Sequence, residues 1–225
     1  MKLYIDSADS RSWTLPAGSP RVTGVTTNPT LVHQAGLPVS LAGYKRLIAA
    51  AADHGFAELM LQVVSADADE NSRLAGQISE DAHARGLKVT MKLPCDPRWD
   101  SALQAIQALG MPTLLTGLSN PIQLMWAIEK RAHWVAPYVG RLDAAGRDVW
   151  ALMRACVEAQ GTGPGLLAAS IKSADVLAQL MGLGAHAVTL RPEFIASLCV
   201  DEVTLSAISQ FERDIADSQP IRSIT

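Results

Sequence analysis

Lys92 is the residue whose type and setting most clearly suggest chemistry in this chain. It lies within a short apolar run, residues 89–94, where an ammonium group is costly to bury unless it is paired or loses its proton. Burial lowers a lysine pKa from roughly 10.4 toward neutrality, and the free amine can then attack a carbonyl carbon and form a Schiff base. The alternative is a strand-end lysine whose charged end reaches water along its aliphatic stem.

Other polar residues occupy similar places along the chain. The first seven predicted strands each reach a polar side chain at or just beyond their carboxyl ends: Asp6, Asn28, Gln62, Lys92, Thr116, Tyr138 and Ser170. In a closed parallel barrel these ends converge on one mouth, where catalytic residues come from several strands. Polar residues also end strands as turn formers, which accounts for Asn28 or Ser170 singly. That explanation fits Lys92 and Gln62 less well, because both lie inside apolar runs.

The elements that must hold these residues alternate along the chain. Short apolar runs alternate with segments of helical periodicity, the pattern of repeated βα units around a parallel sheet. Strands are predicted over 2–6, 24–27, 58–63, 89–92, 113–116, 134–138, 165–169 and 187–190. Helices are predicted over 41–54, 70–85, 101–109, 121–131, 144–159, 173–182 and 193–199, with an amphipathic helix over 201–217.

This pattern predicts an α/β fold, a TIM (β/α)8 barrel formed by residues 1–225 as a single domain with an additional C-terminal helix. Residues 10–21 are the exception, because Pro16, Gly18 and Pro20 leave room only for a loop or one short turn. A glycine follows several predicted helices, where a left-handed cap favours it: Gly55, Gly86, Gly110 and Gly184.

Composition limits the classes of function. With 48% hydrophobic and 18% charged residues among 225, the chain can bury one sizeable core. The net charge of -3 and the absence of a long run of like charges argue against nucleic acid and membrane partners. The three cysteines lie far apart and indicate reduced thiols. No signal peptide is evident, and we expect no apolar run long enough to span a bilayer, so a soluble, cytoplasmic protein is predicted.

Several segments together resemble a known family. Residues 24–31, Gly-Val-Thr-Thr-Asn-Pro-Thr-Leu, are similar to the signature of the transaldolase family, which includes the fructose-6-phosphate aldolases. Residues 3–6, 89–94, 111–116, 136–141 and 168–172 also match, in the family's order, and Gln123 follows Thr116 at the family's spacing. The resemblance covers nearly the whole chain, although only the Thr-Thr-Asn-Pro motif is specific alone.

The resemblance implies a class I aldolase mechanism, which the burial argument for Lys92 independently allows. The Lys92 amine would attack the ketone carbon of a ketose phosphate such as fructose 6-phosphate. The protonated imine would then accept the electrons of the C3–C4 bond, leaving a dihydroxyacetone enamine on the lysine. The resemblance also assigns the neighbouring roles. Asp6, Thr27 and Asn28 would bind substrate hydroxyls, Thr116 and Gln62 would position a water, and Tyr138 would serve as the acid/base group.

Two positions bear on the choice between subclasses. The resemblance implies that transaldolases proper carry a glutamate where this chain has Gln62 and a phenylalanine where it has Tyr138. A glutamine cannot ionise, whereas a tyrosine supplies a titratable hydroxyl. Both residues favour the fructose-6-phosphate aldolase branch. A transaldolase of the pentose phosphate pathway remains the alternative, and Tyr138 could also be a core tyrosine with a satisfied hydroxyl.

The phosphate end of the substrate is expected at Arg141, Ser170 and Lys172, because an arginine fork can donate two parallel hydrogen bonds to a phosphate. Lys172 replaces an arginine of many transaldolases. Arg191 lies where the family usually has an apolar residue or proline, so it either adds a positive group or faces solvent.

The loop after Lys92 departs from the family pattern. Residues 95–99 read Cys-Asp-Pro-Arg-Trp where the family usually shows Thr-x-Glu-Gly. Trp99 either narrows the acceptor side of the pocket or packs on the loop, and Ser119 stands where an aromatic residue is common. Cys95 has no partner histidine and is interpreted as a bystander.

Two other classes of function remain open. One is a non-catalytic barrel that binds a sugar phosphate. The other is an isomerase or epimerase, which would need paired carboxylates or a metal-binding histidine set. The histidines fall outside the predicted strand ends: His33, His54, His83, His133 and His186. We therefore predict neither metal nor cofactor. The resemblance further implies a homo-oligomer, a pentamer or decamer, in which the helix over 201–217 is exchanged between subunits.

Overall fold

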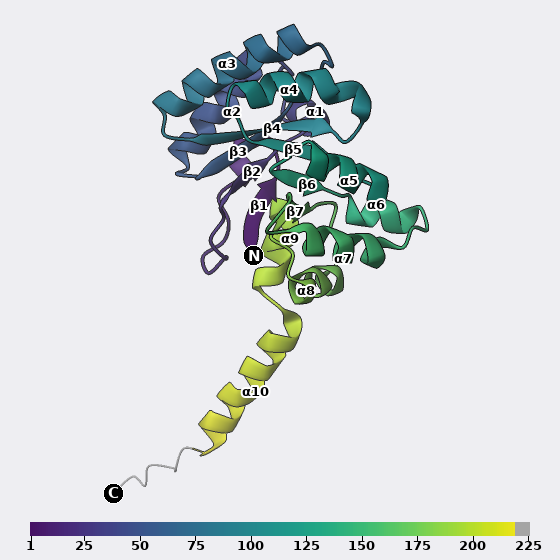
Figure 1. The fold of residues 1–225 in the computed structure, drawn as a ribbon. Helices are drawn as coiled ribbons and strands as arrows, with labels where there is room; N and C mark the ends of the chain where they lie inside the picture. Colours follow the sequence, from purple (N-terminus) through teal and green to yellow (C-terminus); the bar gives the residue numbers. More distant parts are fainter. Residues whose placement is uncertain (219–225) are drawn as a thin grey trace, which may run out of the picture.

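Eight parallel strands close into a barrel in the computed structural model, which describes residues 1–218 (Figure 1). The strands are β1 Lys2–Asp6, β2 Gly24–Thr26, β3 Glu58–Gln62, β4 Lys88–Pro94, β5 Thr113–Thr116, β6 Trp134–Ala136, β7 Gly165–Ala168 and β8 Ala187–Leu190. Each strand pairs with the next, and β8 pairs back with β1. The predicted TIM barrel is confirmed. The assignment of residues 1–225 to one domain reaches past the described residues and stays a prediction.

Helices surround the barrel. They are α1 Pro29–Gln34, α2 Leu41–Asp53, α3 Ala68–Ala84, α4 Asp100–Ala108, α5 Pro121–Glu129, α6 Val139–Ala144, α7 Val149–Ala159, α8 Ala174–Leu183, α9 Pro192–Cys199 and α10 Glu202–Ser218. Two short 3-10 turns, η1 Ser10–Ser12 and η2 Pro97–Trp99, follow β1 and β4. The last helix, α10, projects away from the barrel in Figure 1. None of its residues is buried.

The alternation of side chains along the strands separates an inner from an outer core. The inner cluster fills the barrel with Tyr4, Met60, Leu114, Trp134, Ala136, Leu167 and Ala187. A larger cluster packs the outer strand faces against the helices. The barrel interior is therefore a packed core, and polar side chains at its carboxyl end lie above an apolar floor.

The amino end of the barrel contains a buried carboxylate, Glu58, which is 3% exposed. The Tyr4 hydroxyl donates to Glu58 Oε2 at 2.7 Å, and the Thr90 hydroxyl donates to Oε1. Lys88 Nζ lies 3.3 Å from the same carboxylate. Because each oxygen has a donor, this charged group is satisfied within the fold.

Two helical regions differ from the sequence-based expectation. α1 was not predicted, yet Asn28 Oδ1 accepts from Leu31 N at 3.0 Å and Pro29 begins the helix, which together form a favourable amino terminus. The single helix predicted over 144–159 is instead α6 and α7. Gly146, with φ of 67°, lies between them, and the Asp148 side chain accepts from Ala151 N to begin α7.

The segment after β1 has the predicted form, with only the turn η1 before β2. Trp13, which follows this turn, is buried in the outer core cluster. Its ring meets His54 and Phe56 edge-on at centroid distances of 5.4 and 5.8 Å, and its indole nitrogen donates to Ser7 O. The glycines predicted to end helices, Gly55, Gly86, Gly110 and Gly184, all have positive φ.

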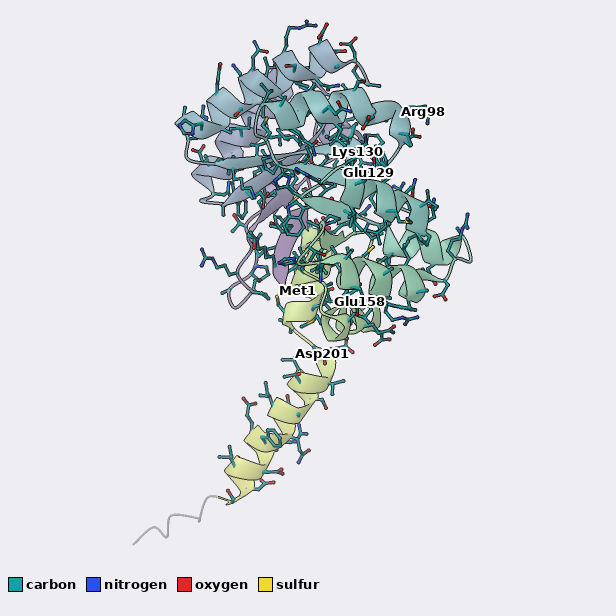
Figure 2. All side chains as sticks on the ribbon, in the orientation of Figure 1. Met1, Arg98, Glu129, Lys130, Glu158 and Asp201 are labelled. Atoms are coloured by element: carbon teal, nitrogen blue, oxygen red, sulfur yellow. The ribbon has the colours of Figure 1, made fainter. Side chains whose placement is uncertain are left out.

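The carboxyl-terminal stretch corrects one expectation. By length and composition alone, Pro192–Ser218 qualifies as a candidate membrane span, because an 18-residue window within it has a mean hydropathy of 1.3, so the expectation that no apolar run is long enough was wrong on these two criteria. This is weak evidence of a span, because Val200 has an extended backbone between α9 and α10 and the charged Asp201 and Glu202 follow it. Figure 2 shows Asp201 at this junction, with side chains projecting from all sides of α10.

Candidate active site

Lys92 lies near the carboxyl end of β4, and its side chain is only 6% exposed. Its Nζ donates a hydrogen bond to the backbone carbonyl of Thr27, the residue after β2. Burial lowers the pKa of Lys92 to about 8, while the negative charge of Asp6 opposes part of this shift. At pH 7 about one amine in ten is therefore uncharged, far more than for an ordinary lysine, and the uncharged form is the one that a Schiff-base nucleophile requires.

Three of the other predicted residues surround Lys92. Asp6 ends β1 and interacts with the lysine through its charge, and Thr27 supplies the accepting carbonyl while its own hydroxyl donates to Met60 O at 3.0 Å. Gln62 ends β3 directly opposite Lys92 in the strand register. Strands β1, β3 and β4 thus bring a carboxylate, an amide and an amine to the same end of the barrel.

Gln62 carries an unpaired polar atom at this place. Its backbone carbonyl accepts from the Tyr44 hydroxyl at 2.6 Å, which fixes the end of β3 against α2. Its side-chain Oε1 is buried and has no hydrogen-bond partner within residues 1–218. A buried carbonyl without a donor is costly. This oxygen is therefore suited to accept from a water or a substrate hydroxyl.

Asn28 has a second role that the sequence did not suggest for it. Its Oδ1 caps α1, so only the side-chain amide group remains to donate toward a ligand. A substrate contact through this residue would therefore use Nδ2.

A pair of hydroxyls forms a second group, at the ends of β5 and β6. Thr116 Oγ1 and Tyr138 Oη lie 2.7 Å apart, and either can be the donor. The guanidinium carbon of Arg141 lies 4.7 Å from the centre of the Tyr138 ring. Arg141 is exposed, so its donors can still reach a ligand while its plane contacts the ring.

Ser170 and Lys172 lie beside this pair. Gly140 N donates to Ser170 O at 3.0 Å, which joins the start of α6 to the end of β7. A Cβ on Gly140 would lie 2.5 Å from Ser170 O and 3.2 Å from both Ser170 Oγ and Lys172 Cε. The absence of a side chain at Gly140 therefore allows these groups to approach the first turn of α6.

No hydrogen bond joins the two groups within residues 1–218. The second group comprises Thr116, Tyr138, Arg141, Ser170 and Lys172, and its Thr116 is paired in register with Pro94. Arg191 is exposed at the end of β8 and begins α9, and its side chain makes no hydrogen bond within the described residues. The predicted site residues thus share the carboxyl end of the barrel, arranged as an amine-containing group and a hydroxyl-and-cation group.

The residues that depart from the family pattern in the loops after β4 and β5 make contacts within the fold. Trp99 is partly buried against the hydrophobic core. Gln123 Nε2 donates to Cys95 O at 2.8 Å, while its Oε1 accepts from Ser119 N at 2.7 Å. Gln123 therefore braces the loop after β4 against the loop after β5. Burial raises the pKa of the Cys95 thiol to about 12, so this cysteine stays protonated.

Sequence reasoning missed one polar neighbour of Asp6. The Thr26 hydroxyl donates to Asp6 Oδ1 at 3.0 Å, and Thr26 is 1% exposed. A β-branched residue is typical of a buried strand, so nothing in the pattern of residues singles out Thr26. Within residues 1–218, no cluster of three histidine, cysteine, aspartate or glutamate side chains has the geometry to hold a metal ion.

Known proteins resemble this chain along most of its length. The family model for Transaldolase/Fructose-6-phosphate aldolase matches residues 3–220. A probable transaldolase from Rhodospirillum centenum is 28% identical over 220 residues, covering 95% of this chain and 90% of that protein. A probable transaldolase from Caulobacter vibrioides is 27% identical over 221 residues, covering 97% and 98%.

A similar solved structure is more distant. The EAL domain of Xanthomonas citri FimX, solved in complex with c-diGMP, superposes with a TM-score of 0.55 at 15% sequence identity, covering 75% of this chain and 73% of that one. At this identity the likeness concerns the fold alone.

Proposed function

Because the chain belongs to the transaldolase/fructose-6-phosphate aldolase family and is thus an enzyme of the aldolase/transferase class, we propose that it cleaves and forms the C3–C4 bond of a ketose phosphate such as fructose 6-phosphate. The observation that carries the proposal is the buried Lys92 amine with a pKa near 8 at the mouth of the barrel.

The first half of the reaction forms the imine. The uncharged Lys92 amine adds to the C2 ketone, and the carbinolamine then loses its hydroxyl group as water to give a protonated imine. Asp6 lies close enough to stabilise the positive nitrogen by its charge. The protonated imine can therefore accept the electrons of the C3–C4 bond more readily than the starting ketone could.

The second half breaks the carbon-carbon bond. A base removes the proton of the C4 hydroxyl, the C3–C4 electrons move into the imine, and the aldehyde leaves. We assign proton transfer to Tyr138 through a water held by Thr116 and Gln62, which is supported by the 2.7 Å hydroxyl pair and the unpaired Gln62 Oε1. Protonation of the enamine at C3 and hydrolysis then release dihydroxyacetone and restore Lys92.

Transfer of the dihydroxyacetone unit to a second aldehyde is the second candidate function, because the relatives are named probable transaldolases. Gln62 and Tyr138 favour hydrolysis in our proposal, since of the three residues assigned to the water only Tyr138 has a titratable group. Both reactions share the Lys92 adduct.

The phosphate of the substrate is proposed to contact Arg141, Ser170 and Lys172. Replacing Arg141 with methionine is expected to raise KM for fructose 6-phosphate by about tenfold, because a charge-assisted contact to phosphate is lost. Unphosphorylated fructose should show a much smaller change. Steady-state kinetics on both sugars test this, and an equal loss for the two would contradict a phosphate contact.

Capture of the adduct and a comparison of products test the function. Borohydride reduction in the presence of dihydroxyacetone or fructose 6-phosphate should add the mass of the donor fragment to the peptide that contains Lys92. A coupled assay should then show cleavage of fructose 6-phosphate without an acceptor. If the dihydroxyacetone unit is transferred to erythrose 4-phosphate faster than fructose 6-phosphate is cleaved, the protein is a transaldolase. If borohydride captures no adduct, the Schiff-base function is refuted and the non-catalytic sugar-phosphate-binding barrel is favoured.

We also propose a homo-oligomer, a pentamer or decamer, located in the cytoplasm. The three cysteines are free thiols, which supports a reducing compartment. The apolar side chains of α10 are exposed, among them Val203, Leu205, Ile208, Phe211 and Ile215. A second subunit that covered these apolar side chains would remove them from water. Sedimentation as a monomer at micromolar protein concentration would contradict the proposed assembly.

A further inference from the structure

A buried hydroxyl on β8 lies behind the residues assigned above. Thr189 is 3% exposed, and its Oγ1 lies 2.6 Å from Thr26 Oγ1. Thr26 in turn donates to Asp6 Oδ1 at 3.0 Å. Two threonines from different strands are therefore linked in series to the carboxylate beside Lys92.

The direction of these hydrogen bonds follows from the number of protons. An ionised carboxylate only accepts, and a threonine hydroxyl has one proton to donate. Thr26 uses its proton for Asp6, so Thr189 must donate to Thr26. Both hydroxyl dipoles then point toward the negative charge, and hydrogen bonds in such a chain strengthen one another.

The strand order explains why Thr189 can support this contact. β8 and β2 are the two neighbours of β1 in the barrel. Thr189 is paired with Tyr4 and Thr26 with Asp6, so the two hydroxyls meet beside the last residues of β1. The hydrogen bond between them spans β1 and limits rotation of the Thr26 hydroxyl.

We propose that Thr189 is a positioning residue for the reaction, which holds the Thr26 hydroxyl toward Asp6 and so fixes the Asp6 carboxylate beside Lys92. The inference rests on the proposed Schiff-base function, because only that function gives the Asp6 carboxylate a role beside the lysine. Thr189 itself touches neither the lysine nor the substrate in this assignment.

A purely structural role predicts different behaviour. Valine has nearly the same volume as threonine but no hydroxyl. The inner face of this strand is otherwise apolar at Ala187, so Thr189→Val would remove only the hydrogen-bonding group. If Thr189 only packed the interior, valine would replace it without loss of turnover. If its hydroxyl matters, valine should be harmful and serine should restore the function.

The first experiment compares Thr189→Val and Thr189→Ser in the whole chain. We expect T189V to lower kcat about three- to tenfold with KM changed less than about twofold, and T189S to remain near the wild type. Thr113→Val is the matched control, because Thr113 is also fully buried on a strand but contacts Gln107, outside the site. A T189V enzyme with wild-type kcat, or equal losses in T189V and T189S, would overturn the proposal.

A double-mutant cycle gives a second readout, the rate at which borohydride captures dihydroxyacetone on Lys92. The effect of T189V should largely disappear in an Asp6→Ala background, because Thr189 then has no carboxylate to hold. Additive effects would overturn the inference. If T189V fails to fold, Thr189→Ala takes its place in the same cycle. No capture in the wild-type enzyme would instead refute the Schiff-base function, and the role of Thr189 with it.

Discussion

Replacing Lys92 with methionine is expected to lower fructose 6-phosphate cleavage by at least about 10⁴-fold and to abolish capture of dihydroxyacetone by borohydride. Methionine preserves much of the volume of the buried side chain but has no amine to form the imine. Among the described residues, the other lysine assigned to the mouth, Lys172, is exposed beside Ser170 and is not expected to replace that nitrogen. Steady-state assays and peptide mass mapping after reduction measure both effects.

The matched control for this change is Lys45→Met, because Lys45 is exposed on α2 and lies in none of the groups described above. K45M should keep both cleavage and capture. Retention of carbon-carbon cleavage by K92M, or a captured adduct on another peptide, would show that Lys92 is not the nucleophile.

The same substitution should make the protein more stable, which is unusual for a change at a buried position. The pKa of Lys92 is about 8 in the folded protein, against an ordinary value of 10.5. The unfolded chain therefore binds this proton more tightly, and the cost to folding is fully present below pH 8, declines above it and vanishes beyond pH 10.5. K92M should raise the free energy of unfolding at pH 7 by about 1–3 kcal/mol.

Urea unfolding of the wild type and K92M at pH 7 and pH 10 tests this sign. The advantage of K92M should shrink at the higher pH, because the wild-type lysine is then neutral in the folded state and pH 10 lies close to the ordinary pKa of 10.5, so the unfolded chain gains little free energy from binding the proton. An equal advantage at both values would mean that packing, rather than charge, determines the difference.

Much of the fold could be predicted because the strands are short, apolar and regularly spaced. β1, β5 and β8 were predicted with their observed bounds, while the others differed by one or two residues at their ends. α1 was missed because it is a short helix that follows directly on the Thr-Thr-Asn-Pro motif, where periodicity has little length in which to appear. The break between α6 and α7 depends on the left-handed Gly146, which a helical pattern alone does not reveal.

The site was predictable to the extent that a residue conflicts with its surroundings. Lys92 and Gln62 were prominent because a cation and an amide are costly in apolar strands. Thr26 and Thr189 raise no such conflict, since threonine suits a buried strand and its hydroxyl is small. Their connection depends on β2 and β8 lying on either side of β1, which only closure of the barrel produces. Residues that support a site through others are therefore harder to find from sequence than residues that carry unusual charge.

Replacing Tyr138 with phenylalanine is expected to lower kcat for fructose 6-phosphate cleavage by about 10²–10³-fold, because the proposed proton-transfer group is lost. The ring remains, so its contact with Arg141 at 4.7 Å should persist and KM should change little. Borohydride capture of dihydroxyacetone should still occur, since Lys92 is intact. The resemblance to transaldolases proper, which carry phenylalanine here, implies that the ratio of transfer to hydrolysis should rise.

Tyr4→Phe is the matched control for Y138F, because Tyr4 also loses a hydrogen-bonded hydroxyl, but the partner of that hydroxyl is Glu58, at the amino end of the barrel. Its hydroxyl donates to Glu58 at 2.7 Å, so Y4F should lower stability by about 1–3 kcal/mol while kcat stays within about twofold. Assays of both variants separate catalysis from folding. If Y138F and Y4F lose similar amounts of activity in proportion to their stability, Tyr138 holds the structure and does not transfer the proton. If Y138F alone loses turnover while retaining the adduct, the defect lies after imine formation, at the step to which its hydroxyl is assigned.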